Sequence, residues 1–274
     1  IREIEPHAVG VGGLHVPGTA AVDFQQIAEA MSRRVDHRGG VVRPNAEVVS
    51  IANRGSQLAL STKAGDITAG YLVNCAGLQS DRMARLAGAD PQVQIVPFRG
   101  EYYEVKDERS YLVNGMVYPV PDPRFPFLGV HFTKTVTGDV EAGPNAVLAL
   151  SREGYDWGSL DTGDLWETLR NPGLWVVARK YWKTGIGEMI RSASSRAFVS
   201  ALQRLVPAIQ VQDVVRAGAG VRAQAMDRQG NLLDDFAIQE SSRALHVLNA
   251  PSPAATASLA IGEHLARVVM ERSG

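Results

Sequence analysis

Leu248-Asn-Ala-Pro-Ser-Pro-Ala-Ala-Thr256, near the end of the chain, leads from a strand-like segment into an apolar helix. Two prolines and Ser252 end the strand, and proline in a first helical turn together with a serine cap favours a helix start. The small residues that follow would let a ligand approach the first backbone N–H groups, at the positive end of the helix dipole. The segment predicts either a site for a developing negative charge or an ordinary loop-to-helix junction.

A glycine-rich segment lies upstream: Ala217-Gly-Ala-Gly-Val-Arg-Ala-Gln-Ala-Met226. Gly218 and Gly220 reduce side-chain bulk beside a single cation, Arg222, and we expect a turn at Gly220. Residues 227–230 are typical of a second turn, and residues 232–238 of a returning strand.

These two segments and four further runs resemble the L-2-hydroxyglutarate oxidase/dehydrogenase family, which are flavin enzymes of the D-amino-acid-oxidase-like group. The runs keep the family's order and are Val73-Asn-Cys-Ala-Gly-Leu-Gln-Ser-Asp81, Val96-Pro-Phe-Arg-Gly-Glu-Tyr102, residues 118–133 with Gly-Val-His-Phe-Thr at their end, and Gly143-Pro-Asn-Ala-Val147. The resemblance implies an α/β (α+β) fold in which an antiparallel-sheet substrate domain is inserted into a glutathione-reductase-type FAD-binding layer.

Three stretches follow from this pattern. Residues 1–92 are expected to form part of the FAD-binding domain, with a helix after Asp23 and an antiparallel meander over 46–53, 57–61 and 67–74. Residues 93–210 are expected to form the substrate domain, an antiparallel sheet followed by helices over 161–205 that include one capped by Ser195. Residues 211–274 are expected to return to the FAD-binding domain and to end in a helix from Ala254.

Bulk composition excludes some classes of protein. With 28 basic and 29 acidic residues the net charge is −1, so nothing favours a nucleic-acid partner. Cys75 is the only cysteine, which excludes an internal disulfide and favours a reducing, cytoplasmic location. No apolar run approaches the ~18 residues of a membrane span. A peripheral contact at the inner membrane face stays an alternative, for which the sequence shows no amphipathic basic helix.

A flavin enzyme of this group opens with a strand, a Gly-x-Gly-x-x-Gly turn and a helix that hold the pyrophosphate. Gly10-Val-Gly-Gly13 has a different spacing and precedes no helix. Because the chain begins at Ile1 rather than Met, we expect the ~30 residues of that βαβ unit to lie upstream. If the molecule lacks them, we expect it not to hold FAD tightly.

Arg99 is the predicted clamp for a substrate carboxylate, because guanidinium binds carboxylate through two parallel hydrogen bonds. The alternative is an arginine on the solvent face of a strand. Tyr102 and Tyr103 point to opposite faces of that strand. Tyr103 shares a face with Arg99 and is the favoured substrate contact, whereas Tyr102 would join the site if Gly100 marks a bulge.

His131 is the predicted general base, since imidazole titrates in the useful range. The alternatives are a structural histidine and a flavin reaction without a protein base. Thr133, on the same strand face, would orient the substrate. The other histidines form no pair at metal-ligand spacing, so no metal site is expected.

The resemblance also implies cofactor contacts. Val48 would lie near the adenine, Ala76 and Gly77 near the ribose or pyrophosphate, and Gly220, Val221 and Arg222 beside the isoalloxazine. Arg222 would serve either the flavin or a second substrate carboxylate. Backbone N–H groups of the final segment would face the N1/O2 edge of the flavin and stabilise its reduced form; this segment comprises Ser252, Pro253, Ala254, Ala255 and Thr256.

The expected activity is FAD-dependent oxidation of L-2-hydroxyglutarate to 2-oxoglutarate, with oxygen or the quinone pool as electron acceptor. Two alternatives stay open: another flavin oxidase of the same group, acting on an amino or imino acid or glycerol phosphate, and a flavin-free module that binds a dicarboxylate or a partner. One departure from the family pattern is Ala20, which stands where relatives tend to have glycine and would be strained only at positive φ.

Overall fold

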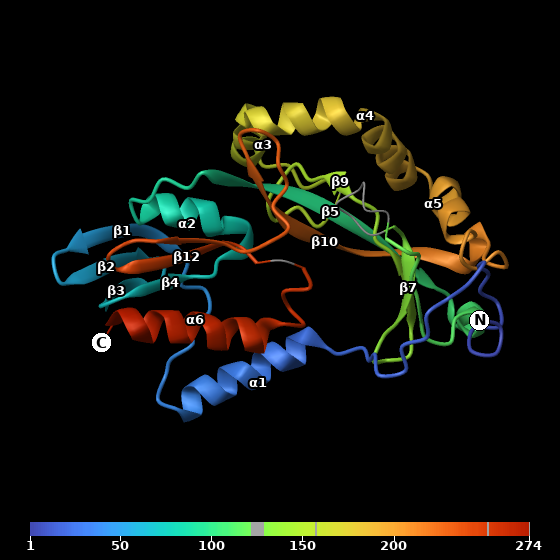
Figure 1. Cartoon of the computed structure of the whole chain (residues 1–274), viewed down its shortest axis with the longest axis horizontal. Helices are drawn as coiled ribbons and strands as arrows, with labels where there is room; N and C mark the ends of the chain where they lie inside the picture. The colour runs from blue at the N-terminus through green and yellow to red at the C-terminus, as the bar shows by residue number, and fades with distance from the viewer. Residues whose placement is uncertain (122–128, 157, 251, 274) are drawn as a thin grey trace. The chain divides into compact units, whose positions relative to one another are not determined.

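The computed structural model describes residues 1–121, 129–156, 158–250 and 252–273. Its helices and strands fall into two compact units (Figure 1). The first unit comprises residues 1–23, 97–170 and 174–222, and the second comprises residues 24–96, 171–173 and 223–274. The middle of the matched run 118–133 lies outside the described residues, as does Pro251.

A six-stranded sheet forms the centre of the first unit. Its order is β10-β5-β8-β7-β6, with β9 also paired to β5. The strands are β5 (Val93–Val105), β6 (Met116–Val117), β7 (His131–Lys134), β8 (Val140–Gly143), β9 (Val147–Leu148) and β10 (Val214–Asp227). The antiparallel sheet predicted from residue 93 onward is therefore present, because β-branched and aromatic residues alternate along these segments.

The predicted turn at Gly220 is wrong. Gly218 and Gly220 lie inside β10, which runs without a break from Val214 to Asp227. The turn at residues 227–230 is confirmed, since the Gly230 N–H donates to the Asp227 carbonyl at 3.2 Å. The returning strand β11 (Ala237–Glu240) begins later than predicted.

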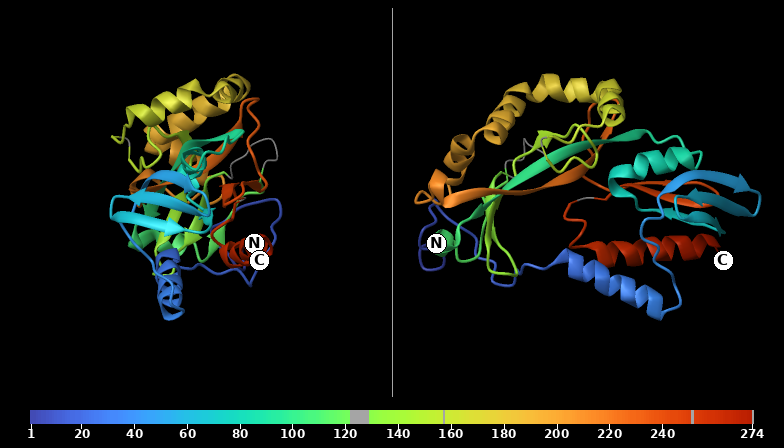
Figure 2. Two further views of the ribbon diagram at one scale, coloured as in Figure 1. Left: turned by 90° about the vertical axis from the view of Figure 1, so that its left-hand side faces the viewer. Right: turned by 180° about the vertical axis from the view of Figure 1, so that it is seen from behind.

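Helices cover one face of this sheet, as Figures 1 and 2 show. They are α3 (Thr162–Arg170), α4 (Pro172–Ala193) and α5 (Ser195–Leu202). The short 3₁₀ turn η2 (Asp107–Leu112) follows β5, and η3 (Val211–Asp213) connects α5 to β10. The predicted helical region 161–205 is confirmed, but Ser195 is the first helical residue and Ser194 is the cap, accepting from the Ala197 N–H at 3.3 Å. The core between helices and sheet is built from Tyr103, Val105, Phe132, Val140, Ala142, Phe198, Val199 and Leu202, among others.

The second unit holds two three-stranded sheets. The antiparallel meander is β1 (Val48–Arg54), β2 (Gln57–Thr62) and β3 (Gly65–Ala69), as predicted. The expected strand 67–74 divides at Gly70, because β4 (Leu72–Asn74) leaves the meander and pairs in parallel with β12 (Ala244–Asn249). The order of the second sheet is β11-β12-β4.

Three α-helices complete the second unit: α1 (Phe24–His37), α2 (Ser80–Leu86) and α6 (Ser258–Ser273), with η1 (Gly77–Gln79) before α2. Every residue of β12 is buried, and Leu265 of α6 packs on Leu245 and Val247. The predicted helix from Ala254 begins instead at Ser258, after a separate turn. Within the described residues no helix is long and apolar enough to cross a bilayer.

Ala20 causes no backbone strain. Among the described residues outside glycine, only Asn45 has a positive φ, at 60°. The methyl group of Ala20 is therefore accommodated at an ordinary backbone conformation.

Candidate active site

The strand register assigns the predicted site residues to the two faces of the six-stranded sheet. Tyr103 is opposite Ala142, which is in turn opposite Phe132. Directly opposed residues share a face, and all three belong to the core beneath the helices. Because side chains alternate along a strand, Tyr102, His131 and Thr133 point to the other face.

His131 is held on that second face by its own backbone. Its Nδ1 lies 3.0 Å from the Gly129 carbonyl, which can only accept, so Nδ1 carries the proton and Nε2 carries the lone pair. Burial lowers the pKa of His131, and the hydrogen bond to Gly129 offsets this only in part. A neutral imidazole with a basic Nε2 is the form that can accept a proton.

Tyr118 supports His131 and is absent from the sequence-based prediction. The two rings stack with centroids 4.3 Å apart and planes 24° apart. The Tyr118 hydroxyl lies 3.2 Å from Thr133 Oγ1. Pairing of Val117 with Phe132 places residue 118 beside residue 131, and only this register reveals the contact.

Tyr102 lies close to this cluster. Burial raises the pKa of its hydroxyl, and the nearby Glu141 and Tyr118 raise that pKa further. Its phenol is therefore protonated at neutral pH and available as a hydrogen-bond donor. The second face thus gathers an imidazole, two phenols and a threonine hydroxyl.

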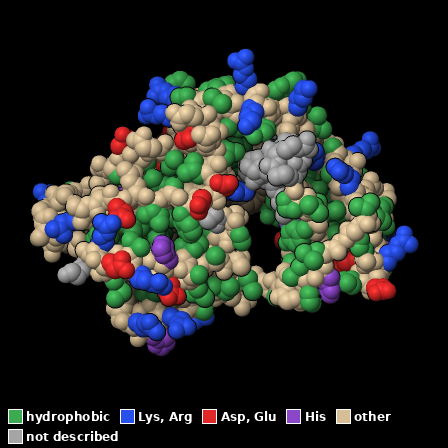
Figure 3. All heavy atoms as spheres, in the orientation of Figure 1, with side chains coloured by type: hydrophobic (Ala, Val, Ile, Leu, Met, Phe, Trp, Pro, Cys, Tyr) green, Lys and Arg blue, Asp and Glu red, His purple; other side chains and the backbone are tan. Residues whose placement is uncertain are grey.

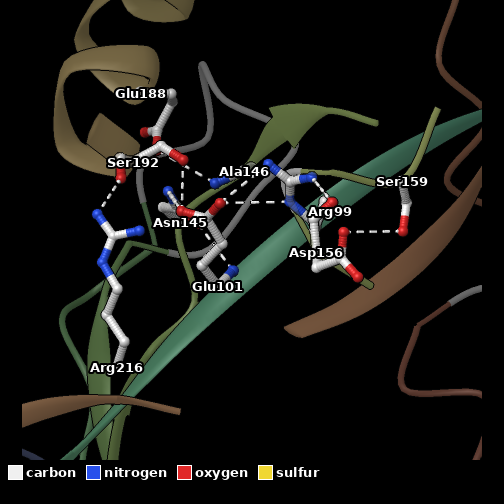
Figure 4. A network of polar contacts seen from close by, with 9 residues as sticks. All are labelled: Arg99, Glu101, Asn145, Ala146, Asp156, Ser159, Glu188, Ser192 and Arg216. Carbon is white, nitrogen blue, oxygen red and sulfur yellow. Dashed lines mark hydrogen bonds and ion pairs between the residues drawn. The ribbon is translucent and has the colours of Figure 1, made fainter. Parts of the chain in front are cut away.

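Arg99 lies on the helix-facing side and is 3% exposed. Its Nη2 and Nε lie 3.0 and 3.3 Å from Glu101 Oε1, and its Nη1 donates to the Asp156 carbonyl at 2.6 Å (Figure 4). Arg99 and Tyr103 share a face, as predicted, and the Tyr103 hydroxyl lies 2.9 Å from Ser195 Oγ. Arg99 and His131 are on opposite faces of the sheet, and their roles toward a substrate stay predictions.

Glu101 is the centre of the network in Figure 4. Asn145 Nδ2 donates to its Oε2 at 3.0 Å, the Ser192 hydroxyl donates to the same oxygen, and its own N–H donates to Asn145 Oδ1 at 2.8 Å. Arg216 of β10 donates to the Ser192 carbonyl at 3.0 Å. The carboxylate therefore joins β5, the segment after β8 and the end of α4.

In the second unit, the predicted cofactor contacts follow the carboxyl ends of two parallel strands. Leu72 pairs with Ala244 and Asn74 with His246, so β4 and β12 end at the same edge of their sheet. Ala76 and Gly77 follow β4, and residues 252–256 follow β12. Ligands of open α/β sheets bind outside the carboxyl ends of parallel strands.

Asn74 fastens the loop that follows β4 and links it to His246 in the middle of β12. Asn74 Nδ2 donates to the Ser80 carbonyl at 2.8 Å and lies 3.1 Å from His246 Nδ1, while Asn74 Oδ1 accepts from the Ala76 N–H at 3.1 Å. Since Nδ1 accepts, the proton of His246 is on Nε2, which is buried and has no hydrogen-bond partner among the described residues. Burial lowers the pKa of His246.

The backbone of these loops leaves room and hydrogen-bond donors for a ligand. Gly77 has φ +53°, and a Cβ at that position would meet nothing within 4 Å, so a ligand could approach the backbone closely. The Ala257 N–H donates to the Pro253 carbonyl at 3.2 Å, which closes a turn ahead of α6. Within the described residues, the N–H groups of Ala254, Ala255 and Thr256 have no partner, whereas Pro253 has no N–H to offer.

The remaining predicted contacts lie in strands. Val48 is the half-buried first residue of β1, opposite Thr62. Gly220, Val221 and Arg222 lie in β10, where alternation turns Val221 and Arg222 to opposite faces. Burial lowers the pKa of Arg222. Within the described part of the chain, no group of three His, Cys, Asp or Glu residues is arranged to hold a metal ion.

The comparisons with known proteins match this architecture. The chain belongs to the family described as "FAD dependent oxidoreductase", which its sequence matches over residues 1–268. Within that family it is 50% identical, over 99% of its length, to the L-2-hydroxyglutarate dehydrogenase of Indibacter alkaliphilus, and it covers 68% of that protein. It is 43% identical to the mitochondrial L-2-hydroxyglutarate dehydrogenase of Caenorhabditis elegans and 42% identical to the human one, over 99% of this chain.

These relatives confirm the resemblance identified from the six sequence runs. The chain covers 65% of the Caenorhabditis protein and 62% of the human protein, so it spans about two-thirds of the length of the curated relatives it matches.

Solved structures of lower identity share the fold. Glycine oxidase from Geobacillus kaustophilus matches 99% of this chain and 61% of its own with a TM-score of 0.64 and 16% identity. L-alpha-glycerophosphate oxidase from Mycoplasma pneumoniae matches 88% of this chain and 54% of its own with a TM-score of 0.63 and 18% identity. The predicted mixed α/β fold with an antiparallel sheet is confirmed.

Proposed function

We propose that the protein oxidises L-2-hydroxyglutarate to 2-oxoglutarate with FAD as cofactor. The observation that carries the proposal is the 50% identity to an L-2-hydroxyglutarate dehydrogenase over 99% of the chain. FAD follows from membership of the family. When bound, FAD supplies the two-electron acceptor for the hydrogen on the substrate's C2.

On the second sheet face, His131 Nε2 accepts the proton of the substrate hydroxyl. Tyr118 stacks on the imidazole and holds its orientation, since a base acts only from a defined position. Tyr102 and Thr133 form hydrogen bonds with the substrate's oxygens. These roles rest on the geometry of β7 and on the lowered pKa of His131, which keeps the base neutral.

Two roles compete for Arg99. In the first, its guanidinium binds a substrate carboxylate, with Arg222 serving the flavin or the second carboxylate. In the second, Arg99 neutralises the buried Glu101 carboxylate, which accepts from Ser192 of α4 and so positions the substrate sheet. The burial of both partners supports the second role.

Backbone groups of the second unit would hold the cofactor. Val48 would border the adenine, Ala76 and Gly77 the ribose and pyrophosphate, and the N–H groups of residues 254–256 the flavin edge that gains negative charge on reduction. The proposal thus assigns FAD binding to residues 1–92 and 211–274 and substrate binding to residues 93–210. It includes oxygen or a quinone as acceptor, and a cytoplasmic location that rests on the single cysteine.

Steady-state turnover with an artificial electron acceptor tests the proposal. We expect the purified protein to oxidise L-2-hydroxyglutarate and to discriminate against the D-enantiomer, glycerol phosphate, glycine and proline. A second carboxylate on the substrate should matter, so L-lactate should react much more slowly. Preference for an amino acid or glycerol phosphate would replace the proposal with another flavin oxidase activity.

Substitution of Tyr118 tests its support of His131. A ring pair contributes about 0.5–1.5 kcal/mol, so Tyr118→Leu should lower kcat up to about tenfold. Tyr118→Phe keeps the stacked ring and should therefore show a smaller decrease in kcat. If Tyr118 acts through His131, the Leu variant also shifts the acid limb of the pH profile of kcat/KM, and the matched Tyr111→Leu variant does not. An unmoved pH profile in Tyr118→Leu would exclude this role.

Buried histidines predict a loss of stability in acid. Because burial lowers the pKa of His246 and of His131, the unfolded chain takes up protons at a higher pH than the folded chain. The free energy of unfolding is therefore undiminished above the ordinary histidine pKa of about 6.5. It decreases as the pH falls from there through the lower pKa values that the two histidines have in the folded state.

We expect the thermal unfolding temperature to decrease between about pH 7.5 and about pH 5.5, and the decrease to be smaller in His246→Gln. His264→Gln, on the exposed surface of α6, is the matched control. Equal slopes in all three proteins would contradict the prediction.

A further inference from the structure

His246 lies in a buried polar cluster on one face of the β11-β12-β4 sheet. It is 0% exposed, whereas other histidine side chains are visible on the surface in Figure 3. Leu245 and Val247, its neighbours in β12, pack against α6, so the His246 side chain points to the opposite face. On that face lies α2, whose Ser80 hydroxyl donates to the Leu248 carbonyl at 3.4 Å.

The hydrogen bonds of Asn74 fix the orientation of its amide group. Its Oδ1 accepts from the Ala76 N–H at 3.1 Å, and a backbone N–H can only donate. Its Nδ2 donates to the Ser80 carbonyl at 2.8 Å, and a carbonyl can only accept. The second hydrogen on Nδ2 is therefore directed to His246 Nδ1, 3.1 Å away, which has to accept it. Only a neutral imidazole with its proton on Nε2 satisfies this arrangement.

Gln239 suits the same tautomer of His246. The two residues are opposite each other in the pairing of β11 with β12, so their side chains share a face. Gln239 Nε2 donates to the Asp90 carbonyl at 3.2 Å, and its Oε1, like His246 Nε2, is buried without a partner among the described residues. Because Nε2 is a donor in both the neutral and the charged imidazole, protonation of His246 changes the hydrogen-bonding character of Nδ1 alone.

The groups packed around His246 leave it without a compensating negative charge. Its partners in β4 and β11 are uncharged amides, and the residues of η1 are uncharged. On α2, Arg85 Nη2 lies 3.1 Å from Asp81 Oδ2, and Arg82 Nη1 donates to Gln79 Oε1 at 3.3 Å. Burial lowers the pKa of His246, so its imidazole is neutral at neutral pH and gains a proton only in acid.

We propose that His246 is a positioning residue for the cofactor loop, residues 75–79, and that only its neutral form holds this loop. A proton on Nδ1 would face the Nδ2 hydrogens of Asn74, donor against donor. Turning the amide would set Nδ2 against the Ala76 N–H and withdraw the donor from the Ser80 carbonyl. Protonation of His246 is therefore incompatible with all three hydrogen bonds of Asn74. The inference rests on the proposed function, in which Ala76 and Gly77 contact FAD.

Reconstitution of the flavin-free whole protein with FAD, followed by flavin fluorescence, tests the proposal. We expect the unaltered protein to bind FAD about tenfold more weakly at about pH 5.0 than at about pH 7.5, because the loop loses its hydrogen bonds below the ordinary histidine range. His246→Asn has an amide oxygen on Cγ, where histidine has Nδ1, and cannot be protonated. It should bind FAD as tightly as the unaltered protein near pH 7.5 and lose much less affinity in acid.

Two further variants complete the series. His246→Leu offers no acceptor to Asn74 and should bind FAD about tenfold more weakly at both pH values. His264→Asn, on the exposed surface of α6, is the matched control and should keep the pH dependence of the unaltered protein.

Hydrogen exchange of the Ala76 amide in the flavin-free protein gives a result that does not depend on FAD. Near neutral pH this amide should exchange about tenfold faster in His246→Leu than in the unaltered protein, and His246→Asn should restore its protection. Unchanged Ala76 exchange in His246→Leu, or an equal decrease of FAD affinity in acid for the unaltered protein and His246→Asn, would overturn the proposal. FAD binding that depends on His246 in a protein that does not oxidise L-2-hydroxyglutarate would support this inference and contradict the proposed function.

Discussion

Replacement of His131 by Gln is expected to lower kcat for L-2-hydroxyglutarate by about 10²–10⁴-fold, the usual contribution of a positioned general base. The hydrogen bond to Gly129 holds the proton on Nδ1, so Nε2 is the nitrogen that accepts. Glutamine fills a similar space but offers no basic nitrogen near neutral pH. KM should change little, because His131 is proposed to contact the substrate hydroxyl and not its carboxylates.

The pH profile gives the sharper result. Because the pKa of His131 is lowered, kcat/KM in the unaltered protein should remain high to below the ordinary histidine range and decrease only in acid. That acid limb should disappear in His131→Gln and persist in His264→Gln. Nearly unchanged turnover in His131→Gln would assign His131 a structural role and leave the reaction without a protein base.

The second large effect concerns the buried pair of Arg99 and Glu101. Their side chains are 4% and 13% exposed, and removing one partner of such a pair typically costs about 3–5 kcal/mol. Arg99→Ala should therefore lower the unfolding temperature by roughly 10 °C, since each kcal/mol corresponds to about 2–4 °C in a chain of this size. Arg99→Lys should recover only part of this loss in unfolding temperature, because an ammonium group cannot make the two parallel hydrogen bonds of a guanidinium.

A double substitution separates the two roles of Arg99. If the residue positions the sheet, Arg99→Ala with Glu101→Ala should be more stable than Arg99→Ala alone, because no unpaired carboxylate is left. If Arg99 binds a substrate carboxylate, Arg99→Ala should retain the flavin and raise KM strongly, and its unfolding temperature should stay unchanged. Removal of the exposed Arg267–Glu263 pair, 66% and 76% exposed, is the matched control and should cost less than about 1 kcal/mol. Unchanged stability and unchanged activity in Arg99→Ala would exclude both roles.

Local patterns predicted most elements but not their pairing. The helix after Asp23, the meander and the helical region 161–205 follow from periodicity and turn residues alone. The break at Gly70 could not be seen, because the apolar pattern continues through it and only pairing with β12, far along the chain, separates β4 from β3. Gly218 and Gly220 suggested a turn, yet pairing in the sheet keeps this backbone extended.

In the candidate site, too, local patterns predicted some relations between residues, and others depend on long-range contacts. Strict alternation along β5 predicted that Arg99 and Tyr103 share a face, and the structure confirms this. Which face meets the helices depends on contacts with Ser192 and Ser195, which no local pattern encodes. The support of His131 by Tyr118 likewise depends on the register of β6 and β7.

The burial pattern of α4 could not be predicted from the sequence. The helix departs from ideal geometry at Tyr181, where φ is −115° and ψ is 20°. Apolar residues occur on both its core side and its outward side, so no single apolar stripe identifies the buried face. Leu174 and Ser192 are buried, whereas Trp175 and Trp182 are exposed.

Anaerobic mixing of the purified flavoprotein with L-2-hydroxyglutarate tests the central claim most directly. We expect rapid loss of the visible absorbance of oxidised flavin with the L-enantiomer, a much slower loss in His131→Gln, and formation of 2-oxoglutarate in an amount equal to the flavin reduced. A flavin that stays oxidised with L-2-hydroxyglutarate, while an amino acid or glycerol phosphate reduces it, would contradict the account.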